Sequence, residues 1–465
     1  MEFKDFNILE LQKLRETNEL TYHELTKYYL NRIESFGDLT NSISCINPNA
    51  LSEAIKLDEE FQNNGLRSLM HGIPVLLKDN INTLDMKTTA GAVVFKDFYS
   101  EDDAFIVKKL KEAGAVILGK TNLSELANFI STESKNGFSA LKGQVVNPYG
   151  KDLDVGGSSS GPGAAVATGL TQVAVGTETS GSILSPALQN SVIGLKPSVG
   201  YVSRQGIIPI SPSQDVPGPM SRNVIDNAIL FNAMLGIDPN DNSTKEDTPI
   251  HIEKIMNFSL KGVRLGYIKS SLIKEASKKE INLIDEQVEL LKELDAIVVE
   301  VEQEKPSKEA NFDILFNEFP SAFEEYLKQE PNAPIKSMND LIEFNKQDPS
   351  GRIPYGQGML DKCNELKLSR VEYEELKKFD IDYASKLDKL ISEHDLDALI
   401  FTGYYGTWLP AKGGFPSVIV PAGYIKGRPF SITFTSTKFT EETLLSIAYK
   451  YEQHSLARKD PSILK

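Results

Sequence analysis

The sequence has little of several features that define common classes of protein. Its 465 residues contain two cysteines, Cys45 and Cys363, too few for a disulfide framework or for a zinc site built from several thiolates, so we expect two packed or surface thiols. The formal net charge of −15 disfavours nucleic acid as a partner, because phosphates require clustered Lys and Arg. No apolar run approaches the roughly 18 residues of a membrane helix, and the opening MEFKDFNILE lacks the basic and apolar parts of a signal peptide. We therefore expect a cytoplasmic protein without nucleic-acid or membrane partners.

The patterning of what is present predicts an α/β fold. Short apolar runs bounded by Gly or Pro alternate with helical stretches, which favours an extended and largely buried sheet. Residues 8–36 have helical spacing, and Thr21 and Glu24 form a capping-box pair within them. Residues 270–395 shift to Lys- and Glu-rich amphipathic helix, yet no repeat or linker marks a domain boundary. The expected strands are 74–77, 115–118, 173–175, 263–268, 296–301, 398–401 and 417–420.

Two formal motif matches do not survive a physical test. Gly114 to Thr121 fits a phosphate-loop string, but its four intervening residues are Ala-Val-Ile-Leu, and a buried strand cannot also be the cradle for phosphate. Residues 238–249 faintly suggest a calcium loop, but Ser243 stands where glycine is needed and Pro249 where a bidentate Glu is needed. We therefore expect neither a nucleotide site nor a calcium site.

Lys78 is a candidate base. It ends the apolar run Gly-Ile-Pro-Val-Leu-Leu-Lys, where desolvation would lower its pKa toward a usable range. A lysine that reaches water or pairs with Asp79 fits the same position. His71 precedes this run, and none of the five histidines falls within 154–223, so a Ser-His-Asp triad would need a histidine brought in by the fold.

Two glycine-flanked serine segments lie in the region richest in Gly, Ser and Thr. They are GGSSSG, residues 156–161, and ETSGS, residues 178–182. Glycine permits sharp turns and exposed N–H groups that could hold an oxyanion. Each segment alone is as well explained as a plain Gly/Ser loop.

The combination of these segments with Lys78 resembles the amidase signature family. The resemblance continues in VILGKTNLSELANF (116–129), Ser131-Thr132-Glu133, GLKPSVGYVSRQGIIPISPSQDVPGPM (194–220) and GGFPSVIVPAGY (413–424), and so covers essentially the whole chain. It is nearest to the branch of peptide amidases and aryl acylamidases.

The resemblance implies a single α/β domain over 1–465, with a mixed sheet wrapped by helices. It implies a catalytic core of about 60–240 plus 395–460 and a variable substrate-pocket segment of about 270–395. It further implies a Ser-Ser-Lys triad of Ser182 as nucleophile, Ser158 as bridge after a cis peptide bond, and Lys78 as base. Remaining implied residues are Thr179, Ser180 and Gly181 as the oxyanion hole, and Ser131 and Ser159 as substrate-binding or supporting residues.

This chain departs from the family at several positions, and the departures bear on the substrate. Ser180 replaces a glycine or an acidic residue, which puts substrate preference in doubt more than the triad. Leu184 stands where many relatives carry arginine, and Asn190 where they carry cysteine. Because a bound carboxylate wants a bidentate cation, a neutral amide fits better. The segment 305–360, with Phe344, Asn345 and Pro354-Tyr355-Gly356-Gln357, looks like a pocket-lining insert suited to an apolar or aryl group.

The expected function is hydrolysis of a neutral carboxamide or anilide through a serine acyl-enzyme, with no cofactor and no metal. The expected partner is a small amide substrate, and a homodimer is compatible with the sequence. Two alternatives stay open: a glutamine-hydrolysing amidotransferase A-type subunit, and a catalytically degenerate ligand-binding member.

Overall fold

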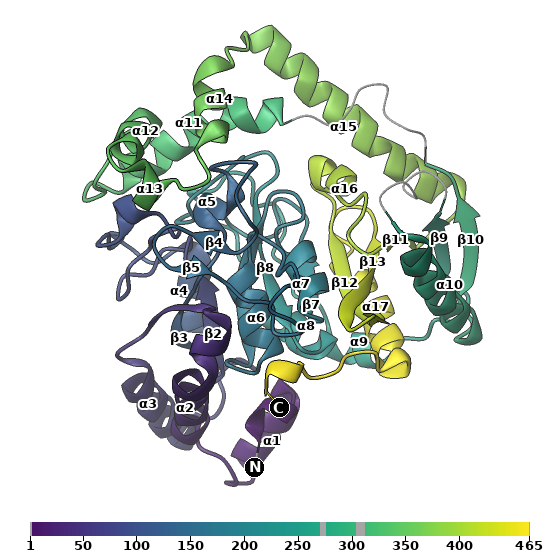
Figure 1. Ribbon diagram of the computed structural model, residues 1–465. Helices are drawn as coiled ribbons and strands as arrows, with labels where there is room; N and C mark the ends of the chain where they lie inside the picture. Colours follow the sequence, from purple (N-terminus) through teal and green to yellow (C-terminus); the bar gives the residue numbers. More distant parts are fainter. Residues whose placement is uncertain (1, 270–275, 304–311, 465) are drawn as a thin grey trace.

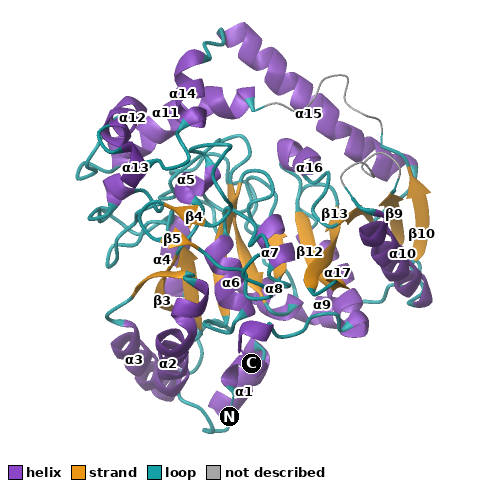
Figure 2. Ribbon diagram, in the orientation of Figure 1, coloured by secondary structure: helices purple, strands orange, loops and turns teal. Residues whose placement is uncertain are grey.

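An eleven-stranded mixed sheet forms the centre of the protein in the computed structural model, which describes residues 2–269, 276–303 and 312–464 (Figure 1; Figure 2). β2 pairs in parallel with β3 and β6, and β9 pairs in parallel with β10 and β11, whereas the pairings between these groups are antiparallel. The strands, in spatial order, are β1 Ile43–Ile46, β3 Val116–Thr121, β2 Pro74–Lys78, β6 Val173–Glu178, β8 Val216–Ser221, β7 Ile193–Lys196, β12 Ser417–Ile425, β13 Arg428–Thr435, β11 Ala398–Thr402, β9 Arg264–Ile268 and β10 Ile297–Val301.

The register of the central strands brings the ends of two strands to one edge of the sheet. Leu76 of β2 lies opposite Ala174 of β6, and the two strands are parallel. Their carboxyl ends therefore meet at the same edge, where ligands commonly bind in α/β proteins. Every residue of β2 and β6 is buried, so a polar side chain at this edge is largely removed from water.

Helices cover both faces of the sheet (Figure 2). Only a short antiparallel pair, β4 Phe138–Ser139 and β5 Gly143–Gln144, is described outside the main sheet. The helices against or beside the sheet are α1 Ile8–Glu16, α2 Tyr22–Thr40, α3 Ala50–Asn64, α4 Phe105–Glu112, α5 Glu125–Asn128, α6 Ser160–Ala167, α7 Leu184–Gln189, α8 Val224–Ala233, α9 Ile252–Asn257, α10 Lys278–Glu293, α16 Trp408–Gly413 and α17 Glu441–Ser455.

Five further helices form an arch beyond one end of the sheet (green in Figure 1). Several of them share a buried cluster with residues 90–130 and 208–210; it includes Phe129, Phe319 and Phe323 and is separate from the main core. The stacked rings of Phe319 and Phe323 have centroids 5.3 Å apart. The arch helices are α11 Asp313–Gln329, α12 Met338–Lys346, α13 Pro349–Arg352, α14 Gly358–Glu365 and α15 Arg370–Glu393.

The structure confirms the predicted α/β class, the mixed sheet and all seven expected strands. Residues 8–36 form two helices rather than one, because Asn18 takes a left-handed conformation (φ 59°) and Thr21 starts α2 with the expected capping box to Glu24. The assignment of 270–395 as a variable segment stays a prediction, and its residues 270–275 and 304–311 lie outside the described residues.

The residues of the two rejected motif matches have structural roles in the fold. Residues 116–121 of the phosphate-loop string are the buried strand β3. Within 238–249, Asp241 pairs with Arg204 at 2.8 Å, and Asp238 accepts hydrogen bonds from Ser203 and Asn240. Cys45 and Cys363 are free thiols.

Candidate active site

Lys78 ends β2 and is fully buried, behind three residues that are also 0% exposed. Its Nζ donates to Ser158 Oγ at 2.7 Å, to Thr177 Oγ1 at 2.8 Å and to the Thr177 carbonyl at 3.2 Å. Burial lowers the pKa of Lys78 to about 7, although the charges of Asp215 and Glu178 act to raise it. A substantial fraction of this amine is therefore neutral near pH 7, as a proton acceptor must be.

Ser158 lies in the loop that leads into α6, after a cis peptide bond between Gly157 and Ser158. Its carbonyl accepts from the Ser124 N–H at 3.1 Å. A Cβ at Gly157 would meet Ser124 Oγ at 2.5 Å and Asn136 Oδ1 at 2.6 Å, so this approach requires glycine. The hydroxyl of Ser158 is fully buried and faces Lys78.

Ser182 lies in the turn between β6 and α7 and is half-buried. Its carbonyl accepts from the Ser159 N–H at 3.0 Å, which joins this turn to the loop of Ser158. Ser159 Oγ in turn donates to the Thr177 carbonyl at 3.1 Å and accepts from the Thr177 N–H at 3.2 Å. Ser159 therefore holds the two serine segments and the end of β6 together.

The Glu178 carboxylate shapes the turn that carries Ser182. It accepts from the N–H groups of Gly181 at 2.7 Å, Ile183 at 2.7 Å and Leu184 at 3.0 Å. Gly181 has φ 87°, whereas Ser180 has no positive φ and is exposed. The left-handed conformation thus falls on the glycine, and a side chain at position 180 is accommodated without backbone strain.

Thr179 is fixed by Asp215, which sequence reasoning missed. Thr179 Oγ1 donates to Asp215 Oδ1 at 2.5 Å, and Asp215 Oδ2 accepts from the N–H groups of Ile210 and Ser211. Burial raises the pKa of Asp215 to about 6 in spite of these donors. Asp215 is 36 residues from Thr179, and no local pattern links the two.

Thr177 and Asn80 were also missed. Thr177 Oγ1 accepts from both Lys78 Nζ and Asn80 Nδ2, the latter at 3.1 Å. A threonine at a strand end is common, so its type alone gives no signal. The available sequence signals were only their positions: Thr177 lies five residues before Ser182, and Asn80 lies two residues after Lys78.

Ser131 is hydrogen-bonded to the arch rather than to Lys78, Ser158 or Ser182. Its Oγ donates to the Tyr355 carbonyl at 2.7 Å and accepts from the Glu133 N–H at 3.2 Å. The Tyr355 ring meets Phe138 edge-on, with centroids 4.9 Å apart. The structure thus brings Ser131 and part of the 305–360 segment together. His71, by contrast, is buried with its ring nitrogens near the Leu57 carbonyl and the Arg67 N–H.

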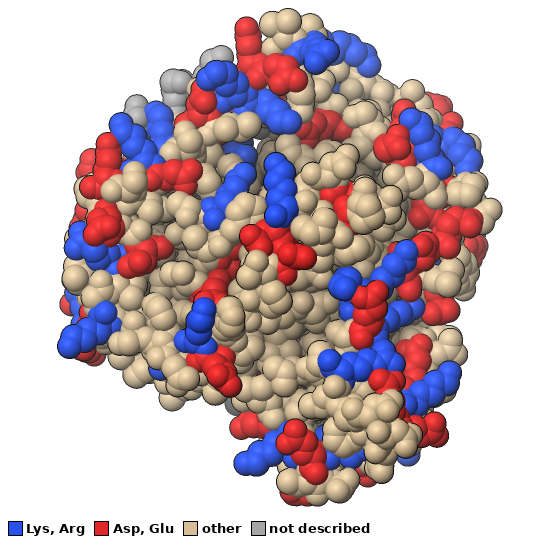
Figure 3. Space-filling model, turned by 180° about the vertical axis from the view of Figure 1, so that it is seen from behind, with Lys and Arg blue, Asp and Glu red and all other residues tan. Residues whose placement is uncertain are grey.

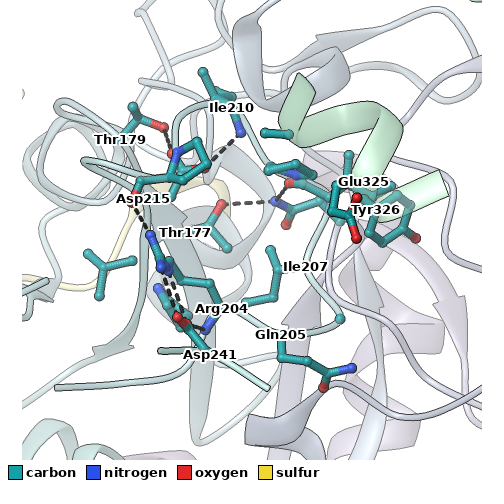
Figure 4. A pocket seen from close by; sticks show the side chains of 18 of the residues that line it. Thr177, Thr179, Arg204, Gln205, Ile207, Ile210, Asp215, Asp241, Glu325 and Tyr326 are labelled. Atoms are coloured by element: carbon teal, nitrogen blue, oxygen red, sulfur yellow. Dashed lines mark hydrogen bonds and ion pairs between the residues drawn. The ribbon is translucent and has the colours of Figure 1, made fainter. Parts of the chain in front are cut away.

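A cavity of about 320 Å³ lies beside the end of β6 (Figure 4). One wall is α11, which shows Glu325 and Tyr326, and the opposite wall includes Ile207, Ile210 and the Arg204–Asp241 pair. Phe344, Asn345 and residues 354–357 are not among the lining residues. Within the 305–360 segment, the cavity is lined by Ser321, Ala322, Glu325, Tyr326 and Gln329 of α11.

The described residues offer neither a metal-binding cluster nor a membrane-spanning helix. They contain no group of three or more His, Cys, Asp and Glu side chains placed to hold a metal ion. No described helix combines the length and apolar character needed to cross a membrane. On the face seen in Figure 3, Lys and Arg are interspersed with Asp and Glu.

Known proteins resemble this chain over nearly its whole length. The family described as Amidase matches residues 24–409. A probable amidase of Arabidopsis thaliana is 36% identical over 464 residues, covering 96% of this chain and 89% of its own. The solved structure of native peptide amidase from Stenotrophomonas maltophilia matches with a TM-score of 0.94 at 36% identity, covering 100% of this chain and 99% of that one. The A-type subunit of the glutamyl-tRNA(Gln) amidotransferase from Thermoanaerobacter pseudethanolicus is 29% identical, covering 100% of this chain and 99% of its own.

Proposed function

The chain belongs to the amidase family, as its sequence resemblance predicted, and on that premise we propose that it hydrolyses a neutral carboxamide or anilide through an acyl-enzyme on Ser182. The observation that carries the mechanism is the 2.7 Å contact between Lys78 Nζ and Ser158 Oγ inside a fully buried strand end. A serine hydroxyl is a weak nucleophile unless a base takes its proton. Lys78, with a pKa near 7, supplies that base.

The proposed relay moves one proton in each direction. As Ser182 Oγ attacks the amide carbonyl, its proton passes to Ser158 Oγ, and the Ser158 proton passes to neutral Lys78. When the C–N bond breaks, Ser158 protonates the departing nitrogen and regains a proton from Lys78. Water then attacks the ester on Ser182 through the same relay, releasing the acid and the free serine.

The oxyanion hole is proposed from backbone N–H groups at Thr179, Ser180 and Gly181, together with that of Ser182. The Gly181 N–H donates to Glu178 in the structure. To stabilise the oxyanion, this N–H must either leave Glu178 or donate to both acceptors at once. Thr179 is held by Asp215, which supports a fixed donor at that position. Fixed donors matter because removing one oxyanion donor costs roughly 3–4 kcal/mol of transition-state stabilisation.

A neutral substrate is favoured by the charges near the site. Leu184 stands where many members of the family carry arginine, and its side chain is fully buried. Arg204, which lines the cavity, pairs with Asp241 at 2.8 Å. A carboxylate group would lack a bidentate partner at either position.

The alternatives make different predictions. An amidotransferase A-type subunit, supported by the likeness to the Thermoanaerobacter protein, would hydrolyse glutamine and form a stoichiometric complex with a partner. A degenerate ligand-binding member would turn over no amide. The close contact of Lys78 and Ser158 favours the hydrolase over this second alternative.

The test is release of ammonia or amine from an aryl anilide, a C-terminal peptide amide, a short aliphatic amide and glutamine. We expect turnover of a neutral amide that Ser182→Ala removes almost completely and that Lys78→Ala lowers by a comparable amount, because such residues act as a unit. Ser52→Ala, on the exposed side of α3, is the control and should retain full activity. Full activity in Ser182→Ala would refute the assignment, and turnover of glutamine alone would favour the amidotransferase.

A further inference from the structure

We propose that a second cavity, at the β1 edge of the sheet, binds a small organic anion that carries one phosphate or carboxylate group on an aryl body. The cavity has a volume of about 400 Å³ and is lined by residues of β1 and of the segments 85–99 and 141–142. Lys78, Ser158 and Ser182 do not line it, and it shares no lining residue with the cavity beside β6. Binding at this site does not depend on the proposed function, so its test needs no amide turnover.

Lysines dominate the charge of the lining. Lys87, Lys96 and Lys142 line the cavity, whereas Asp85 is the one acid among the lining residues. Asp85 also lies 3.4 Å from the ammonium of Lys111, which is not a lining residue. A hollow with an excess of one sign of charge attracts ligands of the opposite sign. An anion therefore meets a net positive lining.

Two of these lysines have an ammonium group available for a ligand. Lys87 pairs with Asp97 at 2.8 Å. Among the residues that the structure describes, no acid lies within ion-pair distance of Lys96 or Lys142, and both lysines are exposed. An ammonium group is a point charge with three donors, so it binds phosphate and carboxylate oxygens without a fixed geometry. The anionic group of the ligand is expected at Lys96 and Lys142.

The two aliphatic hydroxyl groups of the lining are already engaged. Ser44 Oγ donates to Asp79 Oδ2 at 2.8 Å, and Thr89 Oγ1 donates to the same oxygen at 2.5 Å. Asp79 also lies 3.5 Å from the buried ammonium of Lys120. Because a hydroxyl group has one hydrogen to donate, Ser44 and Thr89 offer none to a ligand. The lysines are therefore left to bind its charge.

The other walls of the cavity suit an aryl body. Tyr99 lines the cavity, and 49% of this residue is exposed. A flat ligand that lies against such a ring and against apolar side chains buries apolar surface. A cavity of about 150 Å³ is enough for a benzene-sized molecule, so about 400 Å³ accommodates an aryl ring together with its anionic group. The apolar lining residues are Ile46, Pro48, Met86 and Leu141.

Cys45 also lines the cavity and can report whether the cavity is occupied. Burial raises the pKa of its thiol, although the charges of Lys120 and Lys142 act to lower it. The thiol therefore stays protonated near pH 7, and the ligand binds without a covalent bond. An occupant of the cavity covers this thiol, whereas Cys363 is buried in the aromatic cluster of the arch and outside the lining.

The test combines ligand binding with protection of Cys45. Phenyl phosphate, benzoate, inorganic phosphate and the neutral benzyl alcohol are titrated into the full chain by isothermal titration calorimetry. At each ligand concentration, peptide mass spectrometry follows the rate at which iodoacetamide alkylates Cys45. Lys96→Met combined with Lys142→Met removes both ammonium groups and keeps most of each aliphatic stem. Lys135→Met combined with Lys151→Met removes two exposed lysines outside the lining and is the matched control.

We expect saturable binding of phenyl phosphate or benzoate that protects Cys45 over the same range of concentration. Loss of Lys96 and Lys142 should weaken this binding about tenfold or more, because a hydrogen bond to a charged group contributes about that factor. The control pair should change binding by less than about twofold, since distant exposed charges are screened. Benzyl alcohol and inorganic phosphate should bind about tenfold more weakly than the better aryl anion, and that anion identifies the charged group as phosphate or carboxylate.

Several outcomes would overturn the site. Saturable binding of neither aryl anion is one. Binding that leaves the alkylation rate of Cys45 unchanged, or that is equally strong without Lys96 and Lys142, would place the ligand elsewhere on the molecule, and equal weakening by the control pair would do the same. Equal binding of benzyl alcohol would refute the role of charge, and equal binding of inorganic phosphate would refute the aryl body. A wild type that hydrolyses no amide would refute the proposed function and leave this site untouched.

Discussion

At the scale of single residues, the buried carboxylate of Asp215 acts on two neighbours, the amine of Lys78 and the hydroxyl of Thr179. Burial lowers the pKa of Lys78 to about 7, and the negative charge of Asp215 acts in the opposite direction. Because a charged acid stabilises the protonated amine, removal of that acid makes the amine easier to deprotonate. Asp215 also holds Thr179 through its hydroxyl. In the proposed mechanism it is therefore a positioning residue with an electrostatic effect on Lys78.

We predict that Asp215→Asn shifts the acidic limb of kcat/KM to lower pH and lowers kcat. In the wild type, activity should rise with pH through about 7 as Lys78 loses its proton. The variant loses the charge that raises the pKa of Lys78, so its limb should move down. The measurement is a pH profile of kcat/KM between about pH 6 and pH 9 on a neutral amide, a range that brackets this pKa.

Asp152→Asn, at an exposed position, removes a charge of the same sign and should leave the limb in place. A limb that moves to higher pH in Asp215→Asn would contradict the electrostatic role. If kcat fell but the acidic limb of the pH profile stayed in place, Asp215 would act only by positioning Thr179 through their hydrogen bond.

At the scale of elements, the local sequence pattern predicted where strands occur better than it predicted which strands pair with each other. The seven expected strands were found because each is a short, mainly apolar run, in most cases next to a Gly or Pro residue. β8 was missed because it carries two prolines, and Pro219 nevertheless lies opposite Val175 inside the sheet. The spatial order of the strands could not be predicted, since it depends on pairings between distant segments.

The candidate site likewise contains residues that local sequence predicted and residues that it did not. Lys78 and Ser158 were predicted, and the structure places their side chains in contact across 80 residues of sequence. Asp215 and Glu318 were missed because acids are frequent in this chain and their partners lie far away. Their roles depend on tertiary contacts that one sequence does not encode in any local pattern.

Glu318 joins the arch to the segment that fixes Thr179. Its carboxylate accepts from Ser211 Oγ at 2.5 Å, from Ser213 Oγ at 3.0 Å and from the Tyr373 hydroxyl at 2.6 Å. Ser211 also donates its N–H to Asp215 at 2.8 Å. The Glu318 carboxylate of α11 therefore connects this helix both to α15 and to the 210–215 segment.

We predict that Glu318→Gln destabilises the protein by about 1–3 kcal/mol, because hydrogen bonds to a charged acceptor are worth that much. It should also lower kcat, since the 210–215 segment carries Asp215. Urea denaturation and steady-state kinetics are the measurements. Glu343→Gln removes an exposed acid that pairs with Lys346 on α12, and should change neither quantity; an equal effect of both variants would refute the role of Glu318.

At the scale of the whole molecule, buried carboxyl groups make stability depend on pH. Glu441 begins α17 and is fully buried, where its Oε1 accepts from the Ser198 N–H at 2.6 Å. Burial raises its pKa from 4.5 to about 7. α17 packs on β12 and on α9, so this carboxyl lies where the end of the chain closes on the sheet.

We predict that the free energy of unfolding of the wild type falls between about pH 4.5 and pH 7 through Glu441. The unfolded carboxyl loses its proton near 4.5, whereas the folded one keeps it until about 7, so the folded state binds more protons in this window and stability falls as pH rises. The loss is on the order of 3 kcal/mol, from about 1.4 kcal/mol per pKa unit. Glu441→Gln should lack this part of the pH dependence in urea denaturation at about pH 5 and pH 8.

The neighbouring Glu442 supplies a control of opposite sign. Partial burial acts to raise its pKa, but hydrogen bonds from the His251 N–H and side chain and from Lys254 lower the pKa below its usual value. A carboxyl with a lowered folded pKa adds stability as pH rises through the acidic range. As pH rises through the acidic range, Glu442→Gln should therefore remove a gain in stability, whereas Glu441→Gln removes a loss between about pH 4.5 and pH 7. Identical pH dependence of wild type and Glu441→Gln would mean that the Glu441 carboxyl stays charged at about pH 5 in the folded protein.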